Sequence, residues 1–327
     1  MTDVALDARM TSHMSVGMRQ YARELAVRLP HLAPDLAVMT FGSGDNFDMA
    51  EQLAMPLQIL RTHPRLVHFP SPFAPLIVPA PYVVTIHDLI DLIFPQWAKP
   101  KAGWYFRVAV RRLARAARCV ITDDPATAAD IEQYFGVPRE RIAVIPLGVD
   151  IAPLAPVNRE APYAIYAGNH RPHKDLATLV EAWSRVDPSL ELDLVLTGAK
   201  EATFRSARRA RGRLLFVGDL PHNEVLRWIA GASVLLHAAL REGFGLPLLE
   251  AARLGTPVVA AQSAVPQPLR EYVRTFASGD AAAMARAIEA VLRGDEDARV
   301  AAARDATADL TWDRCVRETA DVYRRFL

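Results

Sequence analysis

Short apolar runs alternate with helical patterns along this chain, and this alternation limits its fold more than any other feature of the sequence. Such runs suit the buried strands of a parallel sheet, and the helical stretches between them supply the crossovers that parallel strands require. The first half is predicted to contain strands at Val4–Ala8, Leu36–Phe41, Leu66–Phe69, Tyr82–Ile86, Cys119–Thr122 and Ile142–Ile145. Its predicted helices are Met18–Leu29, Ala102–Ala116 and Ala126–Phe135.

A proline-rich segment without periodicity, residues 151–160, follows this series and is predicted to be a linker. A second series then gives predicted strands at Tyr163–Ala167, Leu192–Leu196, Leu214–Val217, Val234–Leu236 and Pro257–Ala260. The two series predict an α/β chain of two doubly wound, Rossmann-like domains, residues 1–150 and 161–310, which face each other across a cleft at the carboxyl ends of their strands. A terminal helix is predicted over residues 311–327, with Thr311 as its N-cap.

The composition argues against several classes of protein. With 51% hydrophobic and 23% charged residues the chain is globular, and 327 residues suffice for two domains of ordinary size. The net charge of +1 argues against a general nucleic-acid binder, whose affinity depends on many uncompensated cations. Cys119 and Cys315 stand in no metal-binding or disulfide pattern, so no metal is expected. The opening residues are too acidic for a signal peptide and no apolar run reaches about 18 residues, so a cytoplasmic protein is expected.

The stretch Arg241–Ala261, REGFGLPLLEAARLGTPVVAA, joins two glutamates to a glycine-rich turn that leads into a helix. Gly243 and Gly245 allow a positive φ or the close approach of a ligand, and Pro247 has the fixed φ suited to the first position of a helix. The sequence therefore predicts a tight turn that ends at a helix N-terminus.

The amides of Phe244, Gly245 and Leu246 are expected to remain unpaired at the positive end of that helix, where they form an anion site that fits a diphosphate. Glu250 is expected in the first turn of the helix, where its carboxylate accepts hydrogen bonds from a sugar diol. Glu242, before the turn, is expected to reach a second group of the same ligand.

These residues resemble the E-x7-E signature of the retaining glycosyltransferases of family 4, enzymes of the GT-B fold that use nucleotide-activated sugars. Two glutamates eight residues apart are common by chance, but the EGFGLP turn, the helix and the LGTPVVA strand make the resemblance specific. The resemblance extends over nearly the whole chain. It implies that Glu250 grips the ribose, that Glu242 faces the donor sugar, and that the terminal helix crosses back to the first domain.

The stretch Tyr166–Trp183, YAGNHRPHKDLATLVEAW, leads from a strand through a basic loop into a helix. Lys174 is one of only four lysines in the chain, and it resembles the family lysine that neutralises the donor diphosphate. Some relatives carry an arginine where this chain has Asn169 and others where it has His173, so Arg171 is expected to supply the second charge.

Residues that follow strands of the second domain resemble the family's nucleotide pocket. The expected lining is Gly168, Gly198 with Lys200 nearby, Val217, Gly218 and Leu220. Main-chain contacts and an apolar wall hold a base without reading its identity, so these residues predict a nucleotide but not which one. The donor is expected to be a GDP- or UDP-linked sugar, and no further cofactor is expected.

The first domain is expected to supply the other half of the site. Gly17 resembles the glycine of the family's first loop, although an ordinary strand-to-helix turn explains it as well. His87, in IHDLIDLIFPQW, resembles the family histidine that hydrogen-bonds the donor sugar; its alternative is a structural role. Asp88 is expected to orient His87 or to cap backbone. Asp123 and Asp124 replace a serine-containing segment of relatives, and a helix cap is favoured over contact with an acceptor.

Arginines recur at helical spacing in FRVAVRRLARAAR and are expected on one face: Arg107, Arg111, Arg115 and Arg118. Beside Trp104, Tyr105 and Phe106, this face would bind an anionic membrane surface or a lipid diphosphate acceptor, which would place the protein at the inner face of a membrane. The alternative is a cationic outer face of a helix that covers the first sheet.

The resemblance implies a metal-independent, retaining hexosyltransferase that moves mannose or glucose from a nucleoside diphosphate sugar to a saccharide or lipid-linked acceptor in polysaccharide synthesis. Glu242, His87 and Lys174 are the expected catalytic residues. A nucleotide-sugar epimerase or a phosphorylase of the same fold, and a degenerate sugar-nucleotide-binding protein, remain as alternatives. An NAD-dependent oxidoreductase is weaker, because no G-x-G-x-x-G follows a strand.

Overall fold

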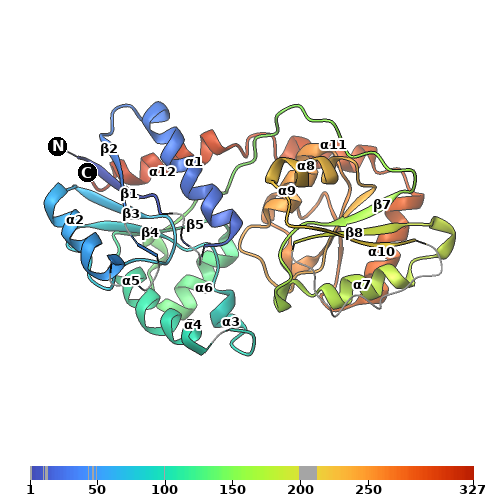
Figure 1. The fold of residues 1–327 in the computed structure, drawn as a ribbon, viewed down its shortest axis with the longest axis horizontal. Helices are drawn as coiled ribbons and strands as arrows, with labels where there is room; N and C mark the ends of the chain where they lie inside the picture. Colours follow the sequence, from blue (N-terminus) through green and yellow to red (C-terminus); the bar gives the residue numbers. More distant parts are fainter. Residues whose placement is uncertain are drawn as a thin grey trace. The chain divides into compact units, whose positions relative to one another are not determined.

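The computed structural model describes residues 2–9, 11, 14–42, 44–45, 48, 50–98, 100–198 and 212–327. The chain forms two compact units (Figure 1). Unit 1 comprises Met1–Gly148 and Leu310–Leu327, and unit 2 comprises Val149–Asp309. Lys200, expected beside the nucleotide pocket, lies outside the described residues.

The sheet of unit 1 has the strand order β2-β1-β3-β4-β5-β6, and every neighbouring pair is parallel. Its strands are β1 (Val4–Asp7), β2 (Val38–Phe41), β3 (Leu66–Phe69), β4 (Tyr82–Thr85), β5 (Cys119–Thr122) and β6 (Ile142–Val144). All six strands agree with the prediction to within two residues. The chain runs from β1 to β2 on one side and then to β3 on the other, which creates a topological switch point between β1 and β3.

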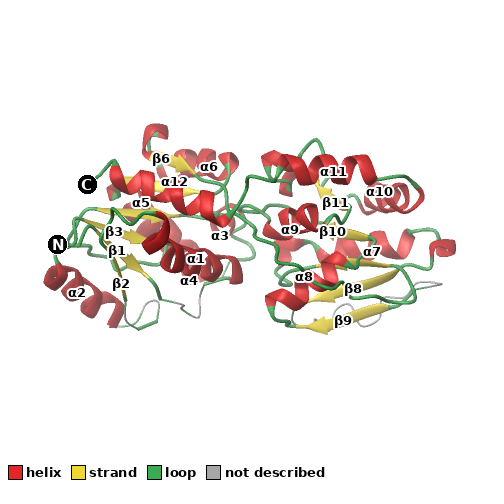
Figure 2. Cartoon of the chain, turned by 90° about the horizontal axis from the view of Figure 1, so that it is seen from above, coloured by secondary structure: helices red, strands yellow, loops and turns green. Residues whose placement is uncertain are grey.

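Helices cover both faces of this sheet (Figures 1 and 2). They are α1 (Val16–Leu32), α2 (Met55–Thr62), α3 (Ile90–Ile93), α4 (Pro100–Tyr105), α5 (Arg111–Ala116), α6 (Pro125–Phe135) and α12 (Trp312–Arg324). Helix α1 begins two residues earlier than predicted, because the Ser15 hydroxyl accepts a hydrogen bond from the Met18 amide and caps the helix. Helix α2 and the π-helical turn before it, Ala50–Ala54, were not predicted.

The helix predicted over Ala102–Ala116 is interrupted by a π-helical turn, Phe106–Val110, between α4 and α5. A π turn takes one residue more than an α turn, so the residues after it face a different direction from that expected for a regular helix. Phe106 and Val110 of this turn belong to the core of unit 1, and Ala109 is also buried. Apolar periodicity predicts a helix here but does not reveal the extra residue.

The terminal helix α12 packs on α1 within unit 1. Thr311 caps it as predicted, since its hydroxyl accepts a hydrogen bond from the Arg314 amide at 3.2 Å. The chain leaves unit 1 and returns to it at nearly one point: a Cβ added at Gly148 would lie 2.1 Å from the carbonyl carbon of Thr311. Only glycine leaves room for that crossing.

A buried polar chain ties α12 to the sheet. The Tyr323 hydroxyl lies 2.6 Å from His68 Nδ1, and His68 Nε2 lies 2.9 Å from Thr85 Oγ1. Thr85 Oγ1 also meets the Tyr21 hydroxyl of α1 at 3.1 Å. Burial lowers the pKa of His68 to about 3, so the imidazole is neutral and offers one donor and one acceptor to its two neighbours.

The sheet of unit 2 has the order β12-β11-β10-β7-β8-β9, again with parallel neighbours. Its strands are β7 (Tyr163–Tyr166), β8 (Asp193–Thr197), β9 (Leu214–Gly218), β10 (Val234–His237), β11 (Val258–Ala261) and β12 (Arg274–Phe276). The first five agree with the prediction to within one residue. The edge strand β12 was missed, because three residues with one apolar side chain at the end do not form an apolar run.

Helices again cover both faces, so the parallel strands between them are buried. They are α7 (Leu176–Arg185), α8 (His222–Ala230), α9 (Leu246–Leu254), α10 (Ala281–Arg293) and α11 (Asp297–Ala306). Trp183 of α7 and Ile288 of α10 belong to the core on one face, whereas Ile229 of α8 and Leu248 of α9 belong to the core on the other. The fold is the predicted pair of α/β units.

The segment predicted as a linker, residues 151–160, has neither helix nor strand. It is held to unit 2 by hydrogen bonds from the Val157 amide to the Arg227 carbonyl and from Arg227 Nε to the Ala155 carbonyl, both 2.9 Å long. Across the described residues, no helix combines the length and the apolar character needed to cross a bilayer.

The Tyr323–His68 contact predicts a specific loss of stability. Tyr323→Phe removes the partner of His68 Nδ1 and leaves a buried polar atom unsatisfied, so the free energy of unfolding should fall by about 1–3 kcal/mol. Urea denaturation of the full chain measures the change. Tyr134→Phe, on the exposed side of α6, is the matched control and should stay within about 0.5 kcal/mol. Equal effects of the two variants would contradict the assignment.

Candidate functional site

The switch point of unit 2 lies between β7 and β10, because the chain runs from β7 outward through β8 and β9 and then returns to β10 on the other side of β7. Open α/β sheets bind ligands at the carboxyl ends of the two strands that flank such a point. The loop after β7 carries Lys174, and the loop after β10 carries Glu242. The two predicted side chains therefore come from the two loops that border one crevice.

Glu242 is the centre of this site. Its Oε1 forms an ion pair with Lys174 Nζ and also lies 2.6 Å from Nε2 of His237, the last residue of β10. The side chains of Lys174 and Glu242 are 14% and 11% exposed. Burial alone would raise the pKa of the Glu242 carboxyl, but Lys174 and His237 outweigh it and lower that pKa well below its usual range. Glu242 is therefore a fixed carboxylate.

The two loops are also joined through their backbones. The His173 carbonyl accepts a hydrogen bond of 2.8 Å from the Leu240 amide, so Lys174 enters the crevice from an anchored turn. Asp175 follows in the left-handed conformation, at φ 48°, and its carboxylate caps α7 at the Thr178 amide. Burial and the neighbouring Lys174 lower the pKa of His173 to about 4, so this imidazole is neutral and adds no charge.

The glycine-rich turn leads into the N-terminus of α9, as the sequence predicts, but two details of the turn differ. Its role as an anion site stays a prediction. Gly245 has φ 82° and stands at the N-cap of α9, while Gly243 is not among the glycines with positive φ. Helix α9 starts at Leu246, so Pro247 occupies its second position rather than its first. Within the described part of the chain, the amides of Phe244, Gly245 and Leu246 donate to no backbone carbonyl outside the helix ladder.

Glu250 is the fifth residue of α9 and lies in its second turn, not in the first as predicted. One turn of an α-helix takes 3.6 residues. Because α9 starts at Leu246, Glu250 lies beyond its first turn and beyond the unpaired amides of that turn. The carboxyl is buried, and this burial raises its pKa to about 7. Its Oε1 lies 3.4 Å from Nε2 of His222, the first residue of α8.

Three glycines bring the neighbouring strand ends together. The Gly168 amide donates to Thr197 Oγ1 at 3.0 Å, and the Gly198 amide donates to the Gly218 carbonyl at 2.9 Å. Gly198 has φ 84°, and a Cβ there would lie 2.4 Å from the Gly168 carbonyl oxygen. A side chain at position 198 would therefore force these strand ends apart.

The remaining predicted nucleotide contacts lie on the same edge of the sheet. Val217 precedes Gly218 at the end of β9, and Leu220 follows in the connection to α8; both are half-buried. Arg171 is exposed, and its backbone amide donates to Asn169 Oδ1. Among the described residues its guanidinium forms no ion pair with Glu242. Its role as second cation stays a prediction.

In unit 1, His87 follows β4 and is held on both ring nitrogens. Nδ1 lies 2.5 Å from Asp123 Oδ2, and Nε2 lies 3.2 Å from the Pro70 carbonyl. Burial favours the neutral ring, yet Asp123 reverses this effect and raises the pKa of His87. Two acceptors require two N–H donors, so the geometry is that of an imidazolium paired with a carboxylate. Contact of His87 with a sugar stays a prediction.

Three other expectations for unit 1 change with the structure. Asp123 holds His87 instead of capping a helix, whereas its neighbour Asp124 does cap α6 through the Ala126 amide at 2.8 Å. Asp88 bonds the Ile90 amide, which is the backbone cap that was one of its two predicted roles. Gly17 is the second residue of α1 rather than part of the loop before it, because the Ser15 cap starts the helix earlier.

His237 and His222 were not predicted, although each contacts one of the two glutamates. A histidine that ends the apolar run VLLH was the available indication, since a polar side chain at the carboxyl end of a buried strand points to a site. Among the described residues, no group of three or more His, Cys, Asp or Glu side chains is arranged to hold a metal ion.

Comparison with known proteins gives both units a family. The family described as "Glycosyltransferase Family 4" matches residues 36–153, and "Glycosyl transferases group 1" matches residues 161–294. O-antigen chain mannosyltransferase B of Escherichia coli is 23% identical over 74% of this chain and 70% of its own length. MMP alpha-(1->4)-mannosyltransferase of Mycolicibacterium hassiacum is 28% identical over 70% of this chain and 60% of its own length. D-inositol 3-phosphate glycosyltransferase of Geodermatophilus obscurus is 32% identical over 60% of this chain and 50% of its own length. Each match therefore leaves part of the relative uncovered.

Solved structures share the fold over the full length. The superposition on sucrose-phosphate synthase from Thermosynechococcus elongatus covers 99% of this chain and 99% of that protein, with a TM-score of 0.73 and 19% sequence identity. HepE from Anabaena, in complex with UDP-glucose, covers 99% of this chain and 100% of its own with a TM-score of 0.73 at 18% identity. With glycosyltransferase domains in both units and this shared architecture, the chain belongs to the family 4 glycosyltransferases of the GT-B fold.

Proposed function

We propose that this glycosyltransferase moves a hexose from a nucleoside diphosphate sugar to a hydroxyl of a saccharide or lipid-linked acceptor and retains the anomeric configuration. The observation that carries the proposal is the Lys174–Glu242 pair at the switch point of unit 2, beside the free amides at the N-terminus of α9. A fixed cation, backbone donors and a helix dipole together suit a departing diphosphate.

Each side chain has a distinct task in this proposal. Lys174 and the amides of Phe244, Gly245 and Leu246 stabilise the negative charge that develops on the leaving diphosphate. Glu242 accepts hydrogen bonds from hydroxyls of the donor sugar, because its carboxylate stays ionised. The bond from the anomeric carbon to the diphosphate breaks as the acceptor oxygen bonds that carbon on the same face. The acceptor proton passes to the leaving phosphate, so the reaction needs neither a protein nucleophile nor a metal.

Glu250 is assigned to the ribose. A carboxyl buried in the second turn of α9 lies past the diphosphate amides, at a distance along the helix that suits the next group of a nucleotide. Two ribose hydroxyls donate to an ionised carboxylate, whereas a protonated carboxyl loses one acceptor site. Donor binding is therefore coupled to the ionisation of Glu250.

The donor proposed is GDP-mannose, ahead of UDP-glucose. Two of the relatives are named mannosyltransferases, and the one named for an O-antigen chain supports a role in polysaccharide synthesis. HepE was crystallised with UDP-glucose, which keeps that donor as the second candidate.

We further propose that unit 1 contacts an anionic membrane, which would place the enzyme at the inner face of that membrane. The four predicted arginines are exposed: Arg107 in the π turn, Arg111 and Arg115 in α5, and Arg118 between α5 and β5. Arg112 of α5 is exposed beside them, and among the described residues none of these five forms an ion pair with a carboxylate. Neither residues 70–82 nor residues 100–118 contain an acidic residue. Exposed Trp104 and Val108 lie on the same helical stretch, 65% and 49% accessible.

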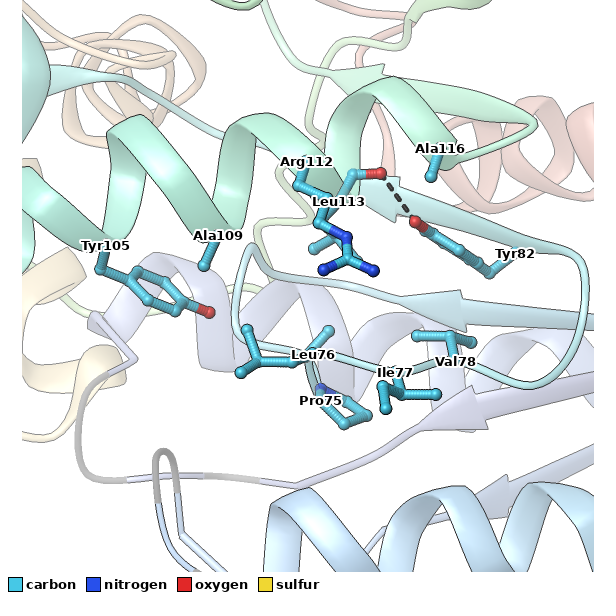
Figure 3. A pocket seen from close by; sticks show the side chains of 11 residues that line it. Pro75, Leu76, Ile77, Val78, Tyr82, Tyr105, Ala109, Arg112, Leu113 and Ala116 are labelled. Atoms are coloured by element: carbon cyan, nitrogen blue, oxygen red, sulfur yellow. Dashed lines mark hydrogen bonds between the residues drawn. The ribbon is translucent and has the colours of Figure 1, made fainter.

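A groove of about 190 Å³ runs along this surface (Figure 3). Leu76 and Ile77 form one wall, Ala109 and Leu113 belong to the other, and the Arg112 guanidinium lies between the walls (Figure 3). Leu76 and Ile77 are 59% and 69% exposed. Apolar side chains that insert at the level of the headgroups, beside cations that attract anionic lipids, are typical of interfacial surfaces.

Nucleotide release tests the proposed reaction. Incubated with GDP-mannose, UDP-glucose and related donors, the protein should release nucleoside diphosphate slowly from one of them, with or without EDTA, as measured by chromatography. Glu242→Gln should slow that release by about a hundredfold, because the charge facing the sugar is lost. Glu132→Gln, an exposed acid on α6, is the control and should match the wild type. Binding without release would favour a sensor, and a changed sugar still attached to nucleotide would favour an epimerase.

The pH dependence of donor affinity tests Glu250. In the free protein its pKa is about 7, and the diol stabilises the carboxylate, so donor binding releases a proton below pH 7. Affinity for the intact nucleotide sugar should therefore rise by about tenfold from pH 6 to pH 8. Glu250→Gln should bind weakly with a flat profile, while His222→Gln separates out the titration of the adjacent imidazole. Affinity that falls over this range would contradict the assignment.

Sedimentation with vesicles tests the membrane surface. The protein should bind vesicles that contain phosphatidylglycerol and not vesicles of phosphatidylcholine alone. Arg111→Gln/Arg115→Gln should weaken binding by about thirtyfold, since each arginine near the surface contributes about 1 kcal/mol. Arg23→Gln/Arg317→Gln removes the same charge from exposed positions elsewhere in unit 1 and should leave binding nearly intact. Equal loss in the two variants would reduce the effect to net charge and exclude a defined surface.

A further inference from the structure

His237 ends β10 and is almost completely buried, with 1% of its side chain exposed. Nε2 lies 2.6 Å from Glu242 Oε1, while Nδ1 is buried and has no hydrogen-bond partner among the described residues. The ring stacks on Tyr166, the last residue of β7, with 6.3 Å between centroids and 21° between planes. His237 thus belongs to one of the two strands that flank the switch point, and its ring contacts the last residue of the other.

The proton on His237 can be assigned from these neighbours. The Glu242 carboxylate only accepts, so Nε2 carries the hydrogen. Lys174 already supplies a positive charge to the same carboxylate oxygen, and a second N–H at Nδ1 would be a buried donor without an acceptor. The neutral Nε2–H tautomer therefore fits the site.

In the proposed reaction Lys174 has to interact with two anionic groups. In the free protein it pairs with Glu242 Oε1, and in the proposed reaction it must also stabilise the donor diphosphate. An ammonium on a flexible stem moves readily between such partners. Without another anchor, Glu242 would lose its position at the step in which it must hold the sugar.

The two oxygens of Glu242 are not equivalent. Both protein contacts, Lys174 Nζ and His237 Nε2, are made to Oε1, and Oε2 has no hydrogen bond to any described residue. A carboxylate fixed through one oxygen presents the other in a constant direction. Oε2 is therefore the atom available to a ligand.

We propose that His237 is a positioning residue that keeps Glu242 Oε1 in place when Lys174 turns to the donor diphosphate, so that Oε2 stays directed at the donor sugar. This inference rests on the proposed function. His237 itself touches neither donor nor acceptor. It acts through Glu242, and its ring is held in turn by Tyr166.

Replacing His237 in the full chain tests the inference. His237→Leu removes the N–H donor at similar volume and should lower kcat for donor turnover by about ten- to a hundredfold, with the donor KM within about threefold. His237→Gln places an amide N–H near the position of Nε2 and should recover kcat to within about threefold of the wild type. His237→Asn, whose amide reaches only the position of Nδ1, should stay as slow as the leucine variant. His31→Leu makes the same chemical change on the exposed end of α1 and should leave both constants unchanged.

The outcomes that overturn the inference are equally specific. Wild-type kcat in His237→Leu would remove any need for the contact. A glutamine variant as slow as the leucine variant would assign the effect to ring packing on Tyr166 rather than to the hydrogen bond. A change confined to KM would place His237 in ground-state binding. If His237→Leu does not fold, the comparison of glutamine with asparagine decides by itself.

Failure of the proposed function gives a different result. If the wild type turns over no donor, the reaction assignment is wrong, and the contact is then tested without turnover. In 15N-labelled protein, His237 should show the neutral Nε2–H tautomer with and without bound GDP or UDP. Lys174→Met should leave that tautomer in place, because His237 holds Glu242 independently. An imidazolium signal, or loss of the Nε2–H in the lysine variant, would overturn the inference.

Discussion

The ion pair between Lys174 and Glu242 is the interaction around which the candidate site of unit 2 is arranged. It joins the loop after β7 to the loop after β10, at the one place in the sheet where the chain reverses its direction of strand addition. Without a partner, either charge would be costly at this depth. Because Lys174 and His237 both contact Glu242, this side chain remains a carboxylate whose charge is balanced by the adjacent cation.

Unit 1 also contains a buried pair of opposite charges, formed by a histidine and an aspartate. His87 and Asp123 also come from the ends of neighbouring strands, β4 and β5, and they also neutralise each other. The difference is in what remains available. Both nitrogens of His87 are engaged by the protein, whereas Glu242 keeps Oε2 without a protein partner. Of the two predicted sugar contacts, His87 therefore has both polar ring atoms bonded to protein, and Glu242 has one of its two oxygens bonded to protein.

Sequence patterns predicted most of the fold, because eleven strands are apolar runs and the GFGLP turn specifies a helix start through its backbone requirements. Sequence patterns failed where one residue changes which way the following helical residues face. This happens at the π turn Phe106–Val110, and at the start of α9, which places Glu250 in the second turn instead of the first. They also failed where a contact joins distant residues. No spacing rule links His87 to Asp123, since that distance depends on which strands become neighbours. His237 and Glu242 are only five residues apart, but their contact depends on how the loop after β10 folds back on the end of the strand.

The crossing at Gly148 has a consequence for biosynthesis. Unit 2 is an insertion: the chain leaves unit 1 after Gly148 and re-enters it at Leu310, against the backbone of Thr311. A ribosome therefore releases all of Val149–Asp309 before α12 exists. Unit 2 is able to complete its sheet first, while α1 and the polar pocket around His68 wait uncovered for Tyr323. The part of the protein made earliest is therefore the last to be closed, because α1 is covered only when α12 packs on it.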